Sequence, residues 1–280
     1  MKKMTADRSP YGKNVFVTGA SSGIGKACAE AFAAAGFHVV GVSRHIEEDE
    51  RLFEGGGSLR TMPMDVTDAE AVHRVVSGME QVDIAVLCAG MGVAGPAEEL
   101  PMDLARLQME VNYFGVLQVA SEILPRMREQ GKGLFMVMSS IAGKVPIPMQ
   151  CHYSSSKYAL EAYVEAVRME MKPFGVRAVL LEPGDTKTGF TASRQSNVRE
   201  DSPYAGICRT SVARMEKDEQ NGRPPESASD VALRMSMRRN PPVRVAIGFE
   251  YKLLMFILRL VPDRMKSWIL GLMYLPGWKG

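Results

Sequence analysis

Short apolar segments recur along the chain at intervals that leave room for a helix between them. Seven of these segments are expected to form strands, at residues 14–18, 37–43, 59–64, 83–88, 133–138, 176–181 and 243–248. The segment at 59–64 has the weakest pattern. A continuous apolar segment, such as Asn14–Thr18, is typical of a strand that is buried on both faces of a sheet.

The stretches between these segments favour helices. An Ala-rich stretch ends at Gly36, a common helix stop, and Asp68 is a suitable helix cap. The expected helices cover about 26–35, 68–77, 103–130 and 151–172, with a possible bend of the third at Pro125. Strands that alternate with helices predict an α/β fold with a mostly parallel, seven-stranded sheet, doubly wound, with helices on both faces. Ligands of such folds bind beyond the carboxyl ends of the strands.

A glycine-rich turn, Thr18-Gly-Ala-Ser-Ser-Gly-Ile-Gly25, connects the first expected strand to the first expected helix. Glycines let the backbone turn tightly and approach a pyrophosphate, and the helix N-terminus presents unpaired N–H groups to it. The turn therefore predicts a dinucleotide-binding, Rossmann-type fold. Its spacing, Gly-x-x-x-Gly-x-Gly, differs from the standard fingerprint, and a turn without a ligand is the alternative.

Tyr153 and Lys157 stand four residues apart, one turn apart on one face of an expected helix. A free tyrosine has a pKa of about 10 and is almost wholly protonated at neutral pH. A neighbouring cation favours the phenolate, so the phenol can exchange protons with a substrate near physiological pH. Tyr-x-x-x-Lys is a common pattern, and the glycine turn upstream is what favours chemistry here.

Together these motifs resemble the short-chain dehydrogenase/reductase family. The matching motifs follow the family's order, namely Thr18–Gly25, Asp65, Ala89-Gly90, Asn112, Ser140, Tyr153-x-x-x-Lys157, and Pro183-Gly184 with Thr186 and Thr188. The resemblance implies one NAD(P)-binding domain over residues 1–280, with a core at about 13–248. It also implies a hydride transfer between nicotinamide and a secondary alcohol or ketone.

The resemblance assigns catalytic roles to four residues. Tyr153 is implied as the general acid/base, and Lys157 as the group that lowers the tyrosine pKa and binds the nicotinamide ribose. Ser140 is implied to hydrogen-bond the reacting oxygen, in preference to Ser139. Asn112 is implied to hold a water of the proton relay, and a buried amide that kinks the long helix is a compatible alternative.

The residues after the segment at 37–43 bear on the choice of cofactor. An acid at this place bonds the adenine-ribose hydroxyls and repels a 2′-phosphate. Ser43 and Arg44 stand here instead, and arginine suits a phosphate, which favours NADP(H) over NAD(H). A solvated loop charge is the alternative for Arg44. The expected cofactor contacts are Gly19, Ser21, Ser22, Gly23, Ile24, Gly25, Ser43, Arg44, Asp65, Val66, Ala89, Gly90, Asn112, Tyr153, Lys157, Pro183, Gly184, Thr186 and Thr188.

One motif departs from the family's pattern. The usual Asn-Asn-Ala-Gly is replaced by Leu87-Cys88-Ala89-Gly90. Cysteine cannot replace the hydrogen bonds of the missing amides, so a weaker local brace is expected rather than lost cofactor binding.

Composition narrows the class of protein further. The net charge of +2 gives no electrostatic reason to expect nucleic acid binding. The four scattered cysteines have no metal-binding spacing, so no metal site is expected, and their usage suits a reducing, cytoplasmic location. The first ten residues lack the apolar region of a signal peptide.

Two regions bear on the substrate and on partners. The polar stretch at about 185–226 stands where the family has a mobile lid over the substrate. The apolar, helical extension at about 250–280 is too short in its apolar runs to span a membrane. Three roles stay open for it: a peripheral membrane contact, a subunit contact, or a wall beside the substrate.

All three roles favour an apolar substrate, and the tail resembles those of hydroxysteroid and retinol dehydrogenases. A hydroxysteroid is therefore the leading candidate. The alternatives are small or lipid-like carbonyl compounds, retinoids, or a catalytically silent dinucleotide sensor. The resemblance also implies a homodimer or homotetramer.

Overall fold

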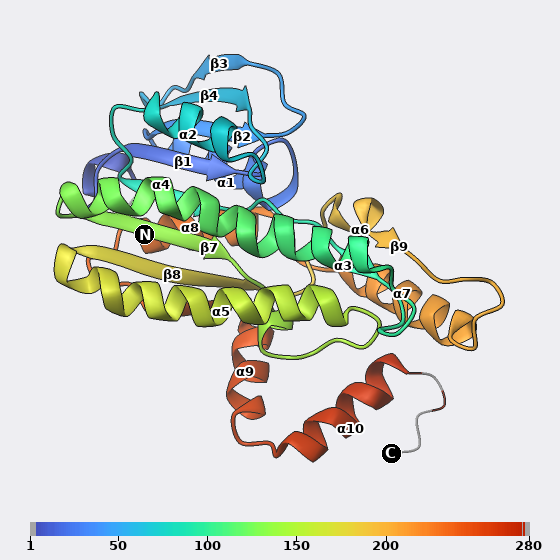
Figure 1. Ribbon diagram of the computed structural model, residues 1–280. Coiled ribbons are helices and arrows are strands. Elements are labelled where there is room, and N and C mark those ends of the chain that lie inside the picture. Colours follow the sequence, from blue (N-terminus) through green and yellow to red (C-terminus); the bar gives the residue numbers. More distant parts are fainter. Residues whose placement is uncertain (1–3, 276, 278–280) are drawn as a thin grey trace.

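The computed structural model of the chain describes residues 4–275 and 277. Its centre is an eight-stranded sheet in the order β10-β8-β7-β5-β1-β2-β4-β3 (Figure 1). The strands are β1 (Asn14–Thr18), β2 (His38–Ser43), β3 (Asp49–Leu52), β4 (Ser58–Pro63), β5 (Ile84–Leu87), β7 (Gly133–Met138), β8 (Val176–Pro183) and β10 (Arg244–Ile247). All seven expected strands are present, and they pair in parallel. The fold is therefore the expected Rossmann-type α/β fold.

The sequence pattern predicts seven strands, and the eighth strand, β3, is not among them. It pairs antiparallel with β4 at the edge of the sheet, and all four of its residues are exposed. Its sequence, Asp-Glu-Arg-Leu, has no buried face and hence no apolar alternation. Main-chain hydrogen bonds to β4 are enough to form an edge strand of this kind, so the side-chain pattern gave no signal.

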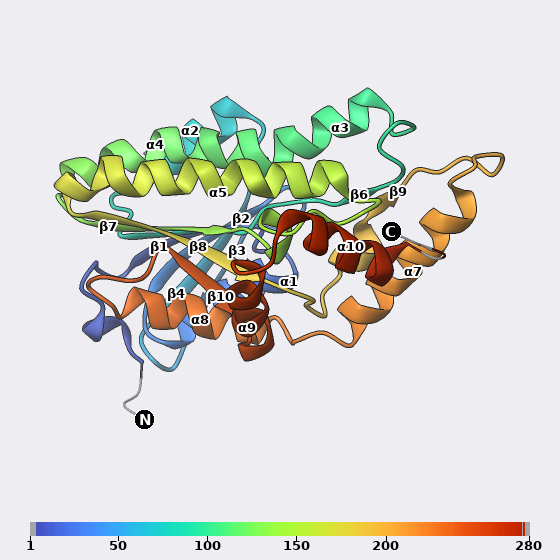
Figure 2. The same ribbon diagram turned by 90° about the horizontal axis from the view of Figure 1, so that it is seen from below.

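Helices cover both faces of the sheet (Figure 2). The helices α2, α4 and α5 lie on one face, and α1 and α8 lie on the other. Their bounds are α1 (Gly23–Ala34), α2 (Ala69–Ser77), α4 (Gly115–Glu129), α5 (Cys151–Met171) and α8 (Glu226–Ser236). Asp68 caps α2 as expected, because its carboxylate accepts from the backbone N–H groups of Glu70 and Ala71, each at 3.0 Å.

Successive side chains along each strand point to opposite faces of the sheet, where they pack into two separate hydrophobic cores. Val15 and Val17 of β1 pack with Phe32 of α1 on one face of the sheet. Phe16, between them, packs with Val119 of α4 and Leu160 of α5 on the other. Because both faces are buried, the strands are apolar throughout, which is why the sequence pattern located them.

The long helix expected at 103–130 is divided. It consists of α3 (Met102–Met109), a π-helical turn (Glu110–Phe114) and α4. The break lies at the turn around Asn112, whereas Pro125, where a bend was considered possible, lies inside α4. A π-turn of this kind carries one extra residue per turn and is frequent at functional sites.

The two regions linked to substrate and partners are also structured. The stretch at 185–226 contains α6 (Phe190–Ser193), β9 (Gln195–Ser196) and α7 (Ala205–Gln220), and β9 pairs with β6 (Val93–Ala94). The extension contains α9 (Phe249–Leu258) and α10 (Asp263–Tyr274), and its residues 276 and 278–280 lie outside the described part. Among the described residues, none of the helices combines the length and apolarity needed to cross a bilayer.

Candidate active site

A cavity of about 390 Å³ lies beyond the carboxyl ends of β1, β2, β4, β5, β7 and β8. It opens where the strand order reverses between β1 and β5, the place at which doubly wound sheets bind ligands. All but one of the expected site residues line it. Those lining it are Gly19, Ser21, Ser22, Gly23, Ile24, Gly25, Ser43, Arg44, Asp65, Val66, Ala89, Gly90, Ser140, Tyr153, Lys157, Pro183, Gly184, Thr186 and Thr188. The exception is Asn112.

The glycine turn forms one end of this cavity. Gly19 and Gly23 have φ angles of +73° and +53°, which side-chain-bearing residues rarely adopt. A Cβ atom on Gly25 would lie 2.2 Å from the carbonyl oxygen of Gly19, so α1 can approach the turn only with glycine here. The glycines of the turn thus let the backbone and the N-terminus of α1 come close to a ligand, which fits a pyrophosphate.

A threonine braces the strand end where the family's two asparagines are missing. The Thr18 hydroxyl, at the end of β1, accepts hydrogen bonds from the backbone N–H groups of Cys88 at 3.0 Å and Ala89 at 3.1 Å. This bridge joins β1 to the residues after β5 without any side-chain amide. The departure in sequence therefore leaves the cavity wall beside Ala89 and Gly90 connected.

The far end of the cavity carries the residues expected to distinguish the two nicotinamide cofactors. The hydroxyls of Ser43 and Ser21 lie 2.9 Å apart, and the exposed Arg44 lines the cavity beside them. Asp65 also lines it, and its carboxylate accepts from the backbone N–H and the hydroxyl of Thr67 at 2.9 and 2.8 Å. Asp65 thus forms a turn with Thr67 and also lines the cavity.

Tyr153 and Lys157 lie on one face of α5 and reach the cavity from the other side. The Lys157 Nζ is 5.7 Å from the centroid of the Tyr153 ring and donates a hydrogen bond to the carbonyl oxygen of Met138 at 2.9 Å. Burial lowers the pKa of Lys157 to about 8. The ammonium is therefore mostly charged at neutral pH, and its position is fixed by the end of β7.

The pKa of Tyr153 shifts in the direction opposite to the one expected. Burial raises it to about 12, a hydrogen bond with Ser140 opposes the rise, and the charge of Glu219 adds to it. Desolvation disfavours the phenolate more than the nearby charges favour it. The phenol is therefore neutral at physiological pH, the form that can donate a proton to a carbonyl oxygen.

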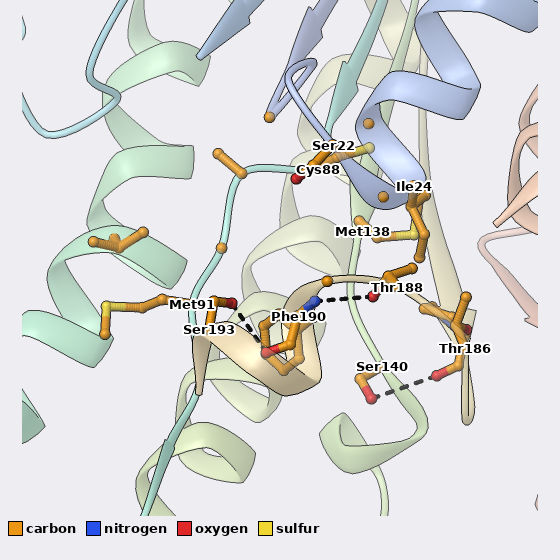
Figure 3. A pocket seen from close by; sticks show the side chains of 18 of the residues that line it. Ser22, Ile24, Cys88, Met91, Met138, Ser140, Thr186, Thr188, Phe190 and Ser193 are labelled. Atoms are coloured by element: carbon orange, nitrogen blue, oxygen red, sulfur yellow. Dashed lines mark hydrogen bonds between the residues drawn. The ribbon is translucent and has the colours of Figure 1, made fainter. Parts of the chain in front are cut away.

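The two adjacent serines have different environments. Ser139 donates a hydrogen bond to the buried Glu161 carboxylate at 2.5 Å, so its hydroxyl is used within the protein. The Ser140 hydroxyl accepts from the backbone N–H of Ala142 at 3.1 Å and faces the cavity (Figure 3). The Ser140 hydroxyl also donates to the Pro183 carbonyl oxygen at 3.4 Å, and its catalytic role stays a prediction.

Asn112 lies in the π-turn, fully buried, behind the cavity wall. Its side-chain carbonyl accepts from the backbone N–H of Met91 at 2.8 Å, and its amide donates to the Met91 carbonyl and the Ser156 hydroxyl, each at 3.1 Å. The side chain thus holds the wall after Gly90. The proton-relay role implied by the family resemblance stays a prediction.

Several lining residues were not expected from sequence. The Phe190 ring of α6 lies 5.7 Å from the Tyr153 ring, centroid to centroid, and Thr188 accepts from its backbone N–H (Figure 3). Glu219 of α7 and Tyr274 of α10 also line the cavity. Glu219 pairs with the buried Arg194 next to Phe190. No motif marks these residues, because α6, α7 and α10 meet only in the folded chain.

Three buried or half-buried charges lie behind the catalytic side of the site. Arg244 of β10 donates through Nε to Glu161 of α5 at 2.7 Å and lies 3.4 Å from Glu182 of β8. Both glutamates are 3% exposed. Because Ser139 also bonds Glu161, the cluster ties the end of β7 to α5, β8 and β10. It therefore supports the position of the neighbouring Ser140.

Glu182→Gln is expected to change how stability depends on pH. Burial, together with the charge of Glu161, raises the pKa of Glu182 from 4.5 to about 7. Because the pKa of Glu182 is higher in the folded protein than in the unfolded chain, protonation of this carboxyl stabilises the fold. That contribution is complete below about pH 4.5 and is lost as the pH rises through 7. The neutral amide avoids that loss, so the variant should exceed the parent by as much as about 3 kcal/mol at pH 8 and match it near pH 4.5.

Urea unfolding at the two pH values measures this difference, with the exposed Glu170→Gln as the matched control. Equal stability differences for Glu182→Gln at both pH values would show that its carboxyl has an ordinary pKa.

Comparison with known proteins adds to this geometry. A sequence model described as short chain dehydrogenase matches residues 13–199. The chain is 34% identical over 267 residues to a 3-ketodihydrosphingosine reductase of Bacteroides thetaiotaomicron, covering 93% of this chain and 97% of the relative. It is 33% identical over 264 residues to an NADPH-dependent 3-dehydrocapnine reductase of Ornithobacterium rhinotracheale, covering 89% and 93% of the two chains.

A solved structure is similar as well. It is a short chain dehydrogenase of Burkholderia cenocepacia in complex with NADP, with a TM-score of 0.71 and 25% sequence identity. The likeness covers 91% of this chain and 95% of that one.

Proposed function

The chain belongs to the short-chain dehydrogenase family of oxidoreductases, and from that premise we propose that it is an NADP(H)-dependent reductase of a lipid-like ketone. The family acts on alcohols and ketones with a nicotinamide dinucleotide. To this general reaction the proposal adds NADP(H) as the cofactor, reduction as the direction of the reaction and a lipid-like ketone as the substrate class. The observation that carries it is that Tyr153, Lys157 and Ser140 line the same cavity as the glycine turn.

The residues of the site suit a ketone reduction. NADPH, held by the glycine turn and by the residues after β2, β5 and β8, would supply the hydride. The Tyr153 phenol and the Ser140 hydroxyl would both hydrogen-bond the ketone oxygen, and Tyr153 would donate its proton to it. Lys157, charged at neutral pH, would stabilise the phenolate that forms.

The substrate class is supported by two observations. Apolar side chains line the cavity, among them Met91, Ile147 and Phe190, and the Phe190 ring lies 5.7 Å from the Tyr153 ring. The two reductases described above act, by their names, on lipid-like ketones. These names favour a lipid-like ketone over the hydroxysteroid that was the leading candidate from sequence.

An activity screen tests this choice. NADPH oxidation is measured with long-chain ketones, ketosteroids, retinal and small ketones. The long-chain ketones should give the highest kcat/KM, and a ketosteroid that exceeds them at least tenfold would restore the earlier candidate.

Arg44→Ala tests the preference for NADP(H). Loss of a charge-assisted contact to the 2′-phosphate costs about 1.5–3 kcal/mol, so the KM for NADPH should rise about 10- to 100-fold. The KM for NADH should stay within about threefold, because NADH lacks that phosphate. Steady-state kinetics with both cofactors measure the split. Arg51→Ala, an exposed arginine outside the cavity, is the control. Equal losses for NADPH and NADH would refute the preference.

We also propose a homodimer or homotetramer in the cytoplasm. Large apolar side chains are exposed on α3, on the π-turn and on α5, namely Leu107, Phe114, Tyr158 and Met169, and side chains of this kind can contact a second copy. The four cysteines are free thiols, which supports a reducing compartment. Size-exclusion chromatography with light scattering measures the oligomeric state.

A further inference from the structure

The helix α9 carries an exposed apolar stripe that faces away from the body of the protein. Phe249, Leu253, Phe256 and Ile257 are spaced i, i+4, i+7 and i+8, so they share one face of α9. Leu260, in the turn directly after the helix, adds a further exposed apolar side chain. The exposed fractions of these side chains range from 45% for Ile257 to 76% for Phe249. None of the residues of α9 is buried. Such a continuous apolar face in water is unusual for a surface helix.

The helix α10 repeats this feature. Met265, Trp268 and Leu272 are spaced i, i+3 and i+7 and are 49–51% exposed. Gly271 is the one buried residue of α10. Figures 1 and 2 show both helices, in red, outside the layers that cover the sheet. A tryptophan on such a face is typical of a side chain at a membrane–water boundary.

Basic side chains flank both stripes. At 100° per residue, Lys252 and Arg259 lie together along one side of the α9 stripe, and Arg264 and Lys266 lie on either side of the α10 stripe. The acids nearby are already paired, Glu250 with Arg223 at 2.6 Å and Asp263 with Lys266 at 3.0 Å. Within the described part of the chain, Lys252, Arg259 and Arg264 are exposed and form no ion pair. The two apolar stripes therefore have a positive border.

The opposite sides of both helices are attached to the active site. The Tyr251 hydroxyl donates to the Asp185 carboxylate at 2.8 Å and accepts from the Asp185 backbone N–H at 2.9 Å. Its ring packs against Gly184, where a Cβ atom would lie 2.1 Å from it. Tyr274 of α10 lines the cavity, and its carbonyl accepts from Ser211 of α7. These contacts fix the inner sides of α9 and α10 to the rest of the protein, so the apolar stripes on their opposite sides face outward.

We propose that α9 and α10 dock on the surface of an anionic lipid membrane, with their apolar stripes inserted at the boundary between headgroups and acyl chains. The positive border complements anionic headgroups. A second copy is the weaker fit, because a two-fold contact would place each basic border against itself. The exposed apolar residues of α3, the π-turn and α5 offer other side chains for that contact. The inference does not depend on the proposed reaction.

Vesicle sedimentation of the full-length protein tests the inference. The parent should bind vesicles of phosphatidylcholine with phosphatidylglycerol, and should bind pure phosphatidylcholine at least about fivefold more weakly. The triple variant Phe249→Ser/Phe256→Ser/Leu260→Ser should lose at least about tenfold in affinity for the anionic vesicles. The variant Lys252→Glu/Arg259→Glu should lose about tenfold in affinity for anionic vesicles, and its affinity for neutral vesicles should stay almost unchanged.

An exposed apolar residue elsewhere provides the matched control. Leu52→Ser removes a side chain that is 85% exposed on β3, and it should bind anionic vesicles as the parent does. Circular dichroism and NADPH binding confirm that each variant is folded. The inference is overturned if the parent does not bind anionic vesicles or if the control variant loses as much as the triple variant. The inference is also wrong if the triple variant binds vesicles as the parent does but is a monomer where the parent is a dimer. That result would identify the stripes as a subunit contact.

Discussion

Tyr153→Phe is expected to lower kcat for ketone reduction by about 10²- to 10⁴-fold, while NADPH binding stays within about twofold of the parent. The substitution removes one hydroxyl, the group that would donate the proton. The ring stays, and with it the contact to Phe190 at 5.7 Å. The phenol is also neutral in the folded protein, because burial raises its pKa to about 12. The loss should therefore appear across the whole range from pH 6 to 9.

Two measurements separate chemistry from binding. NADPH oxidation with a reducible ketone gives kcat, and titration calorimetry gives the affinity for NADPH. Tyr158→Phe is the matched control, since Tyr158 lies on the same helix, is 41% exposed and does not line the cavity. It should keep the parent's kcat. If Tyr153→Phe reduces the ketone as fast as Tyr158→Phe, another group donates the proton and the mechanism is wrong.

Arg244→Met is expected to lower the free energy of unfolding by about 3–5 kcal/mol at pH 8. Above pH 7 Glu182 carries charge beside the Glu161 carboxylate, and Arg244 bonds Glu161 and lies beside Glu182. Lys144, whose Nζ lies 3.4 Å from the Glu161 carboxylate, is a second cation of the cluster. Methionine keeps much of the side-chain volume, but it leaves the buried Glu182 without its cation and Glu161 with only Lys144 as a partner cation. Hydrogen bonds to Glu165 and Glu161 hold the pKa of Arg244 above its usual range, which agrees with a strongly bound cation.

Urea unfolding with a single cooperative transition measures this loss. The control is Arg214→Met, which removes an exposed pair with Asp218 and should cost no more than about 0.5 kcal/mol. Combining Arg244→Met with Glu161→Gln should recover part of the stability, because Glu182 then no longer faces a second buried carboxylate. A loss for Arg244→Met no larger than that for Arg214→Met would show that water already solvates the cluster.

The amino-acid sequence by itself determined the sheet and most of the cavity. Strands buried on both faces must be apolar throughout, so a segment such as Asn14–Thr18 is visible without any tertiary information. The glycine turn is visible for a similar reason, because a backbone that passes within 2.2 Å of a would-be Cβ atom at Gly25 tolerates only glycine. Parallel strands then bring the residues after their carboxyl ends to one edge, whatever lies between them.

Other features were decided by the tertiary structure alone. The strand β3 forms through main-chain bonds to β4, and the lining residues Phe190, Glu219 and Tyr274 come together only when α6, α7 and α10 pack around the cavity. The pKa of Tyr153 rises rather than falls, because the spacing of Tyr153 and Lys157 specifies a nearby cation but not how far water is excluded from the phenol. Burial depends on every element that packs around a group, and no local pattern contains that information.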